Sequence, residues 1–219
     1  MLDALIFDFD GLILDTELPI YEAWKECYAS YGEELPLEVY RQCVGSDFSN
    51  SAYHPDQELE KLVGRELPWE TLRPRMEDRV QEIVAQKDAL PGVRELLQEA
   101  HDAAVPCAIA SSSSRKWVGS WLEKLELLPL FETLVNIDDV ERPKPAPDLF
   151  QLAAERLGIR PDRALVLEDS LNGLKAAKTA GIRCLIVPNP VTRGLPFDGA
   201  YRERETLAGV TLVGLREEW

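Results

Sequence analysis

Uninterrupted apolar runs recur along the chain, and most of them end at a polar residue. The first run covers residues 3–8 and is bounded by acids. A short run of this kind is typical of a strand that is buried on both faces of a parallel sheet. Comparable strands are predicted at "PCAIAS", "TLVNID", "ALVLED" and "RCLIVP", which are residues 106–111, 133–138, 164–169 and 183–188.

Helical patterns separate these later strands. They are predicted at residues 93–103, around Trp117, Trp121 and Leu125, and at residues 148–158 and 171–181. Strands that alternate with helices predict βαβ units and a parallel sheet.

Residues 17–87 differ, because they carry helical patterns and no strand. Leu18, Trp24 and Tyr28 recur at helical spacing, and further helices are predicted at residues 36–45, 55–64 and 69–87. The economical interpretation is an α/β fold with a doubly wound parallel sheet built from residues 1–16 and 88–219. An all-helical insert, residues 17–87, interrupts it after the first strand.

The charge balance excludes some partners. The chain has 219 residues, with 24 Lys and Arg against 39 Asp and Glu, and its net charge is −15. Nucleic-acid binding depends on clustered cations, so no nucleic-acid partner is expected. An anionic substrate would need a metal ion or a well-placed lysine to approach so acidic a protein.

No membrane partner is expected either, since no apolar run is long enough to cross a bilayer. The opening residues carry acids where a signal peptide has basic residues, which favours a cytoplasmic location. The cysteines show no CxxC spacing, so they are expected to be reduced packing residues, and no zinc site is predicted.

Polar residues of matching chemistry follow the predicted strands. Ligands of an open parallel sheet bind beyond the carboxyl ends of its strands. In chain order, the residues at those ends are Asp8 and Asp10, then Ser111 and Ser112, then Lys144 after a short loop, and then Glu168 and Asp169.

This set suits a phosphoryl group held beside Mg²⁺, which prefers hard oxygen ligands. Asp8 and Asp169, with the Asp10 carbonyl, could supply such ligands, and Glu168 would bind directly or through water. Lys144 would add a positive charge, and Ser111 a donor to a phosphoryl oxygen.

A carboxylate can also attack phosphorus and form an aspartyl-phosphate, while a second acid protonates the leaving alcohol. Each feature has a simpler explanation, since Asp-x-Asp-Gly also forms turns and a serine cluster can cap a helix. Their conjunction at successive strand ends favours phosphoryl transfer.

These residues resemble the motifs of the haloacid dehalogenase (HAD) superfamily. Motif I appears as "DFDGL" from Asp8, motif II as "CAIAS" ending at Ser111, motif III as "KPAPD" from Lys144, and motif IV as Glu168-Asp169. Leu12 departs from the usual Thr or Val at a packing position.

The resemblance implies a Rossmann-like core and a helical cap of the β-phosphoglucomutase-like subfamily. Asp8 would be the nucleophile and Asp10 the general acid and base. Ser111 and Lys144 would bind phosphate, with Ser112 beside them, and Asp169 would hold Mg²⁺. The hinges of the cap would lie at residues 15–17 and 87–90, and a monomer would suffice because the cap closes on its own core.

A phosphatase and a mutase are harder to separate. The mutases of the subfamily carry a His four residues before a cap Trp, where this chain has Ile20 before Trp24. They also carry a cap Arg, which is missing from "CVGSDFSNS", residues 43–51. Three other arginines of the insert could instead bind a remote phosphate, meaning a substrate phosphate other than the reacting one, namely Arg73, Arg75 and Arg79.

The predicted function is therefore Mg²⁺-dependent hydrolysis of a small phosphorylated metabolite, for example a sugar phosphate. A phosphosugar mutase is the alternative, and a non-catalytic phospho-ligand binder is a third hypothesis from another class. Trp117 and Trp121 are interpreted as packing residues. Glu17 could face the substrate or simply begin a helix.

Overall fold

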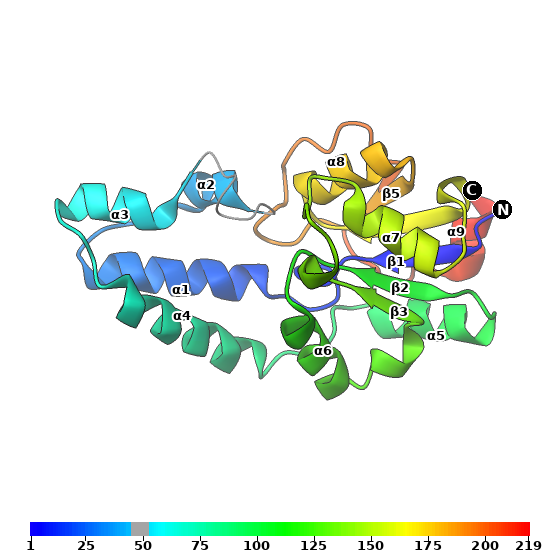
Figure 1. Cartoon of the computed structure of the whole chain (residues 1–219), viewed down its shortest axis with the longest axis horizontal. Coiled ribbons are helices and arrows are strands. Elements are labelled where there is room, and N and C mark those ends of the chain that lie inside the picture. The colour runs from blue at the N-terminus through cyan, green and yellow to red at the C-terminus, as the bar shows by residue number, and fades with distance from the viewer. Residues whose placement is uncertain (45–52) are drawn as a thin grey trace.

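The computed structural model describes residues 1–44 and 53–219. Within these residues the chain forms a six-stranded parallel sheet with the strand order β3-β2-β1-β4-β5-β6 (Figure 1). The strands are β1 (Ala4–Phe7), β2 (Cys107–Ala110), β3 (Thr133–Val135), β4 (Ala164–Glu168), β5 (Arg183–Ile186) and β6 (Arg202–Glu203). The predicted α/β architecture with a parallel sheet is confirmed.

β1 lies at the centre of the sheet, although it comes first in the chain. Its Ile6 is in register with Ala108 of β2 on one side and with Val166 of β4 on the other. All four residues of β1 are buried, because helices cover both faces of the sheet.

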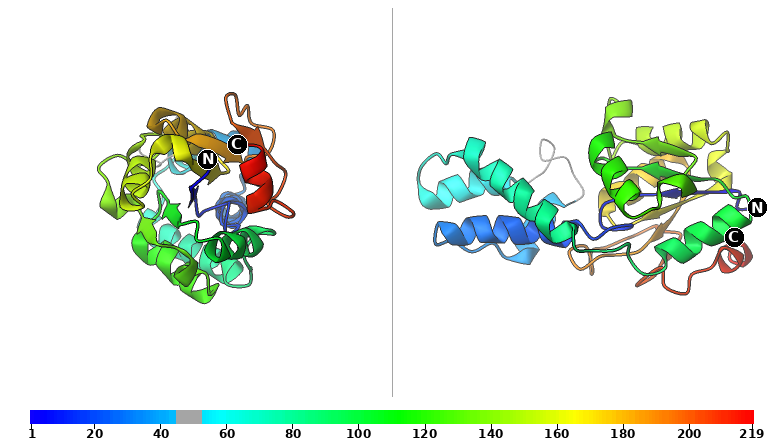
Figure 2. Two further views of the ribbon diagram at one scale, coloured as in Figure 1. Left: turned by 90° about the vertical axis from the view of Figure 1, so that its right-hand side faces the viewer. Right: turned by 90° about the horizontal axis from the view of Figure 1, so that it is seen from below.

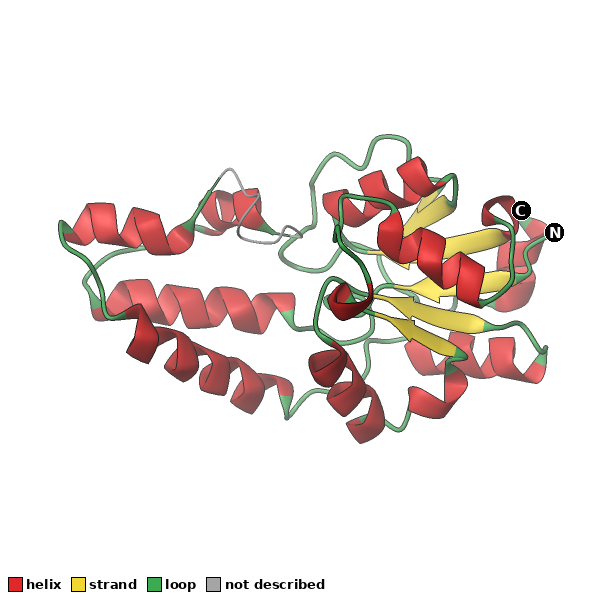
Figure 3. Cartoon of the chain, in the orientation of Figure 1, coloured by secondary structure: helices red, strands yellow, loops and turns green. Residues whose placement is uncertain are grey.

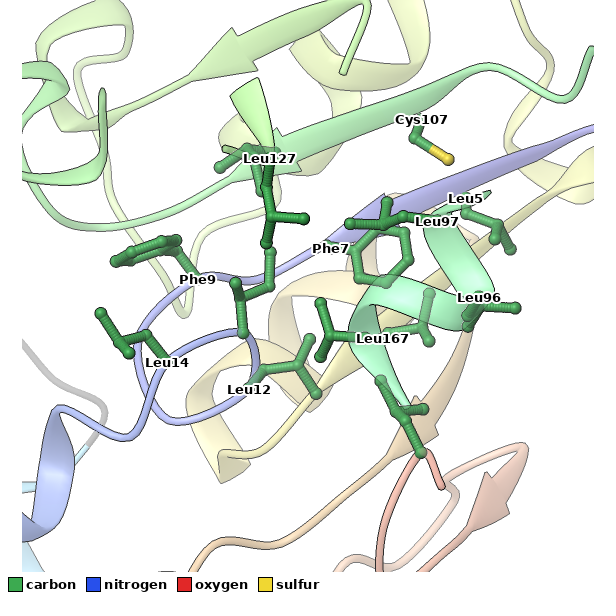
Figure 4. Packing of buried hydrophobic residues seen from close by; sticks show 14 of the residues in the cluster. Leu5, Phe7, Phe9, Leu12, Leu14, Leu96, Leu97, Cys107, Leu127 and Leu167 are labelled. Carbon is green, nitrogen blue, oxygen red and sulfur yellow. The ribbon is translucent and has the colours of Figure 1, made fainter. Parts of the chain in front are cut away.

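Alternate residues of β1 belong to different hydrophobic clusters, as the twofold periodicity of a strand requires. Leu5 and Phe7 pack in one cluster with Leu96 and Leu97 (Figure 4). Ala4 and Ile6 belong to the cluster on the opposite face. The first face is covered by α5 (Val93–Asp102), α6 (Arg115–Lys124) and α9 (Leu212–Glu217), and the second by α7 (Asp148–Arg156) and α8 (Leu171–Ala180).

The segment between β1 and α5 forms a helical block beyond the carboxyl ends of the strands. Figures 2 and 3 show this block at one end of an elongated molecule, with the strand arrows pointing toward it. Its helices are α1 (Glu17–Ser30), α2 (Leu37–Tyr40), α3 (Pro55–Val63) and α4 (Trp69–Val84), with the 3₁₀ turn η1 (Arg41–Cys43). A third hydrophobic cluster, which includes Trp24, Tyr28 and Leu59, fills the block and also contains Val191 from the loop after β5.

Two chain segments connect the block to the sheet, and they lie side by side. The Leu90 amide donates to the Ile13 carbonyl at 2.8 Å, and Lys87 Nζ lies 2.7 Å from Asp15 Oδ2. Both contacts fall at or beside the predicted hinges, so the two connections are tied to each other.

Some boundaries differ from the predictions. β3 ends at Val135 rather than at residue 138, because the Asp139 carboxylate accepts the Asn136 amide at 2.9 Å and begins the turn η4 (Ile137–Asp139). The helix predicted at 36–45 is divided into α2 and η1, and residue 45 lies outside the described residues. β6 and α9 were not predicted, because each is too short to show a period. Further 3₁₀ turns in the described part of the chain are η3 (Leu128–Leu130) and η5 (Pro161–Arg163).

The cysteines are all buried and form no disulfide, which agrees with their interpretation as packing residues. Among residues 1–44 and 53–219, no helix has the length and apolar character needed to span a bilayer.

Candidate active site

The predicted strand-end residues line one cavity between the sheet and the helical block. The cavity has a volume of about 540 Å³. From the sheet side it is lined by every residue predicted for the site: Asp8, Asp10, Ser111, Ser112, Lys144, Glu168 and Asp169. The parallel sheet brings them together because its strands all end at the same edge.

Lys144 lies between two carboxylates at the bottom of this cavity. Its Nζ is 2.5 Å from Asp8 Oδ1 and 2.7 Å from Glu168 Oε1. All three side chains are at most 9% exposed, so the ion pairs are only weakly screened by solvent. The Phe150 ring lies under the ammonium group, 4.7 Å from its centroid to Nζ.

Burial sets the protonation behaviour of these groups. It raises the pKa of Asp8 to about 7, although the charge of Lys144 opposes the shift. Burial would also raise the pKa of Glu168, but Lys144 and the neighbouring donors hold it below its ordinary value. Burial disfavours the charged form of Lys144, yet Asp8 and Glu168 raise its pKa overall, so the ammonium remains charged.

Glu168 is held in place by the turn that follows β4. Its Oε2 accepts the amides of Asp169 and Ser170, each at 2.7 Å, and the Ser170 hydroxyl at 2.9 Å. A Cβ atom at Gly173 would lie 1.8 Å from Oε1, so only glycine leaves room for this carboxylate. Glu168 is therefore fixed between the turn and Lys144.

Asp169 points toward the loop after β5. Its Oδ2 accepts the side-chain amide of Asn189 at 2.5 Å. Burial and the charges of Glu168 and Asp8 raise the pKa of Asp169 well above its ordinary value. Bringing these carboxylates together thus costs free energy unless a cation neutralises them.

Their arrangement fits a divalent metal ion. Carboxylate oxygens of Asp8, Glu168 and Asp169 lie within 4.8 Å of one another, and all three residues are buried. A set made only of oxygen ligands suits Mg²⁺ rather than a softer metal.

Asp10 accepts several hydrogen bonds from side chains around it. Thr16 Oγ1 and Trp117 Nε1 donate to its Oδ1, each at 2.9 Å. Ser113 Oγ donates to its Oδ2 at 2.6 Å, and Ser111 Oγ lies 3.4 Å from the same oxygen. Trp117 thus packs against Trp121, as predicted, and also donates a hydrogen bond to Asp10, which was not predicted from the sequence.

The four serines that follow β2 serve two structural purposes, helix capping and cavity lining. Ser114 caps α6 by accepting the Trp117 amide at 3.2 Å, and all four serines from Ser111 to Ser114 line the cavity. The Ser112 hydroxyl is buried, and among the described residues it has no hydrogen-bond partner. Helix capping therefore applies to Ser114, which also lines the cavity, and donation to a phosphoryl oxygen by Ser111 stays a prediction.

The helical block supplies the opposite wall of the cavity. Glu17, Ile20 and Trp24 of α1 line it, together with Arg73 and Glu77 of α4. Burial and the charges of the nearby aspartates raise the pKa of Glu17 to about 8. Glu17 is therefore both the first residue of α1 and part of the cavity wall, and its contact with a substrate stays a prediction.

Of the three arginines considered for a remote phosphate, Arg73 lines the cavity. Its Nη2 lies 2.5 Å from Asp56 Oδ2, so its charge is already paired. Arg79 pairs with Glu26 at 3.1 Å on the exposed surface. Residues 45–51 of the stretch "CVGSDFSNS" lie outside the described residues.

Four residues of the site were not assigned to it from the sequence: Thr16, Ser113, Trp117 and Asn189. Asn189 could have been found, because it follows the fifth predicted strand just as the other site residues follow theirs. Ser113 directly follows the predicted site residue Ser112, and Thr16 lies six residues after the predicted site residue Asp10. Trp117 had no such signal, since its spacing from Trp121 is equally typical of packing.

Comparison with known proteins places the chain in a family. A family described as haloacid dehalogenase-like hydrolase matches residues 5–187. YhcW of Bacillus subtilis (strain 168) is 41% identical over 213 residues, which cover 97% of this chain and 96% of YhcW. The phosphorylated carbohydrates phosphatase of Thermotoga maritima is 30% identical over 186 residues, covering 83% of this chain and 82% of that protein.

A similar solved structure is that of CbbY from Rhodobacter sphaeroides in complex with xylulose-(1,5)bisphosphate. It has 29% sequence identity and a TM-score of 0.78, and the match covers 98% of this chain and 99% of that one. The family match extends over most of the sequence, and curated relatives align over most of its length. The chain therefore belongs to the haloacid dehalogenase-like hydrolase family.

Proposed function

We propose that this protein is a Mg²⁺-dependent phosphatase that hydrolyses a small phosphomonoester through an aspartyl-phosphate on Asp8. The observation that carries the proposal is the pairing of Asp8 and Glu168 with Lys144, in a cavity where other side chains hold Asp10. One carboxylate is thus available for attack and another for proton transfer. The Thermotoga maritima relative, named as a phosphatase of phosphorylated carbohydrates, supports the reaction class.

In the first step, an Asp8 oxygen attacks phosphorus as the bond from phosphorus to the ester oxygen breaks. Asp10 donates its proton to that leaving oxygen, so an alcohol departs rather than an alkoxide. In the second step, Asp10 takes a proton from a water molecule that attacks the phosphorus. Inorganic phosphate leaves, and the Asp8 carboxylate and the protonated Asp10 are restored.

Lys144 and the serines after β2 act on the phosphoryl oxygens. The ammonium group balances the charge that the phosphate brings next to Asp8. The Ser111 and Ser112 hydroxyls can donate to phosphoryl oxygens, and Ser112 has no competing partner among the described residues. Glu168 fixes Lys144 through its Oε1, since its other oxygen, Oε2, is held by the turn after β4.

Asp8 and Asp169 would hold Mg²⁺, with the Asp10 carbonyl and Glu168 nearby. The ion would supply positive charge that lowers the repulsion between the substrate and the buried carboxylates. Asn189 orients Asp169 for this role through its side-chain amide.

The charges of the cavity favour a substrate with one phosphate and an uncharged remainder. Among the described lining residues the cations are Lys144, which serves the reacting phosphate, and Arg73, which is paired with Asp56. Glu77 adds a carboxylate to the far wall, and Glu17 adds a second carboxyl group. A second phosphate would meet these acids, whereas sugar hydroxyls could hydrogen-bond to them.

We also propose that residues 17–87 act as a cap over a core formed by residues 1–16 and 88–219. The cavity lies between these two parts of the chain, and their two connections run side by side. Opening at residues 15–17 and 87–90 would admit the substrate, and closing would exclude bulk water.

The test is phosphate release from a panel of sugar monophosphates and from p-nitrophenyl phosphate, with Mg²⁺ and with EDTA. Mg²⁺-dependent release is expected, and Asp8→Asn should lower kcat by about 10³-fold or more, because it removes the nucleophile. Asp162→Asn is the matched control, since Asp162 is exposed and lies before β4, far from the cavity. Full activity of Asp8→Asn would refute the proposed mechanism.

The same panel decides between the alternatives. Transfer of phosphate between two positions of a sugar without net release would establish the mutase. Tight binding without turnover of any substrate would establish a phospho-ligand binder.

A further inference from the structure

The hydrogen bonds to Asp10 are of two kinds. The hydroxyl groups of Thr16, Ser111 and Ser113 can rotate, and each can either donate or accept a hydrogen bond. The indole N–H of Trp117 can only donate. Trp117 is therefore the partner that constrains the protonation of the Asp10 carboxyl group.

The position of Trp117 is fixed by its surroundings. It lies in the first turn of α6, where its amide is bonded to the Ser114 side chain. Its ring meets that of Trp121 edge to face, with centroids 5.6 Å apart and an interplanar angle of 76°. An indole held in this way presents its N–H to Asp10 Oδ1 in one direction, 2.9 Å away.

Both protonation states of Asp10 are needed in the reaction proposed above, on which this inference rests. An oxygen that accepts from Trp117 and also from Thr16 is a poor place for a proton. Oδ2 faces Ser111 and Ser113, whose hydroxyls can turn to accept a hydrogen bond from a protonated carboxyl group.

We propose that Trp117 is a positioning residue for Asp10, whose indole N–H keeps Oδ1 an acceptor and so assigns the transferable proton to Oδ2. Asp10 then donates from Oδ2 to the leaving oxygen, and recovers its proton at Oδ2 from the attacking water. Trp117 gains and loses no proton in either step.

Trp117→Phe tests the proposal, because it keeps an aromatic ring and removes the N–H. The measurement is kcat/KM, which reports the step in which the leaving group departs. An alkyl leaving group needs the Asp10 proton, whereas p-nitrophenolate can leave without it. We expect kcat/KM to fall about 10- to 100-fold for a sugar monophosphate, within the range that general acid catalysis supplies, and less than about threefold for p-nitrophenyl phosphate.

Trp121→Phe is the matched control. It lies one turn further along the same helix, and among the described residues its buried Nε1 has no hydrogen-bond acceptor. If Trp117 were only a packing residue, the two variants would behave alike, and Trp117→Phe would lower both kcat/KM values by the same factor. Either outcome would overturn the proposal.

A second readout does not require turnover. In an ¹H–¹⁵N spectrum, Asp10→Asn should shift the indole N–H signal of Trp117, identified by its loss in Trp117→Phe, more than that of Trp121. Equal shifts would also overturn the proposal. A wild-type protein inactive on both substrates would instead refute the proposed function, and the spectrum would still decide whether Trp117 contacts Asp10.

Discussion

Glu17 gives a prediction about stability that can be worked through in detail. It is the first residue of α1 and faces the cavity, close to the carboxylates of Asp8 and Asp10. The perturbation is Glu17→Gln, which keeps the shape of the side chain and removes its ability to ionise. In the metal-free protein, this change should stabilise the fold at pH 8 and have little effect at pH 5.

The sign follows from the pKa of Glu17, which rises from 4.5 to about 8 on folding. Between these two pH values the folded protein binds a proton that the unfolded chain has released, so stability falls as the pH rises. At 1.36 kcal/mol for each pKa unit, the full shift would cost about 4–5 kcal/mol. Solvent in the cavity reduces this, and about 2 kcal/mol is expected at pH 8.

The assay is thermal unfolding in EDTA at pH 5 and at pH 8. For a chain of this length, a gain of about 2 kcal/mol corresponds to a rise of about 4–8 °C in Tm. Other acids titrate in both proteins, so the difference between the two reports the ionisation of Glu17 together with its effect on neighbouring acids such as Asp169. Saturating Mg²⁺ should shrink that difference, because a bound cation offsets the neighbouring negative charges.

Glu22→Gln is the control, since Glu22 is exposed on the same helix. Its Tm should follow that of the wild type at both pH values. The reasoning would be refuted if Glu17→Gln raised Tm equally at pH 5 and pH 8, or lowered it at pH 8. Either result would show that ionisation of Glu17 does not destabilise the folded protein.

Other positions give shorter predictions. Gly173→Ala should destabilise the protein by about 2–3 kcal/mol and abolish most activity, because the new Cβ would displace Glu168 from Lys144. Gly119→Ala should instead stabilise it by up to about 1 kcal/mol, since the site on α6 is open. Asn189→Ala should raise the Mg²⁺ concentration needed for half-maximal activity by about 10- to 100-fold, because Asp169 loses its amide partner.

These effects have internal controls. Chemical denaturation should move the two glycine variants in opposite directions, and a loss of stability in Gly119→Ala would contradict the packing of α6. Asn189 also stabilises its own loop, where its backbone N–H donates to Thr192 Oγ1 at 3.0 Å. Thr192→Val removes that bond alone, so an equal rise in the Mg²⁺ requirement would assign the effect to the loop.

The strand ends were predictable from the sequence because two local signals coincide there. A continuous apolar run identifies a buried strand, and the first polar residue after it marks the edge where ligands bind. Asp8, Ser111 and Glu168 were found in this way. The helical block was equally visible, since its helical patterns extend from residue 17 to residue 87 without a strand.

The rest depended on contacts that sequence periodicity does not encode. Trp117 and Trp121 have the same residue type on one helix, and only the position of Asp10 makes their roles different. β3 was overextended because Ile137 continues the apolar pattern, whereas a hydrogen bond from the Asn136 amide to Asp139 ends the strand. Hydrogen bonds of this kind depend on the folded positions of two residues, and the spacing of apolar residues along the chain does not reveal them.

The central place of β1 has a consequence for how the protein is made. β1 is translated before both of its neighbours, and its partners on β2 and β4 begin only at Cys107 and Ala164. At ordinary rates of synthesis, roughly 10–30 s separate β1 from the completion of β4. During that time a fully apolar strand has two unpaired edges, while the helices that follow it can already form from local contacts. Ribosome-bound chains that stop before residue 164 should therefore be the species that most needs chaperones.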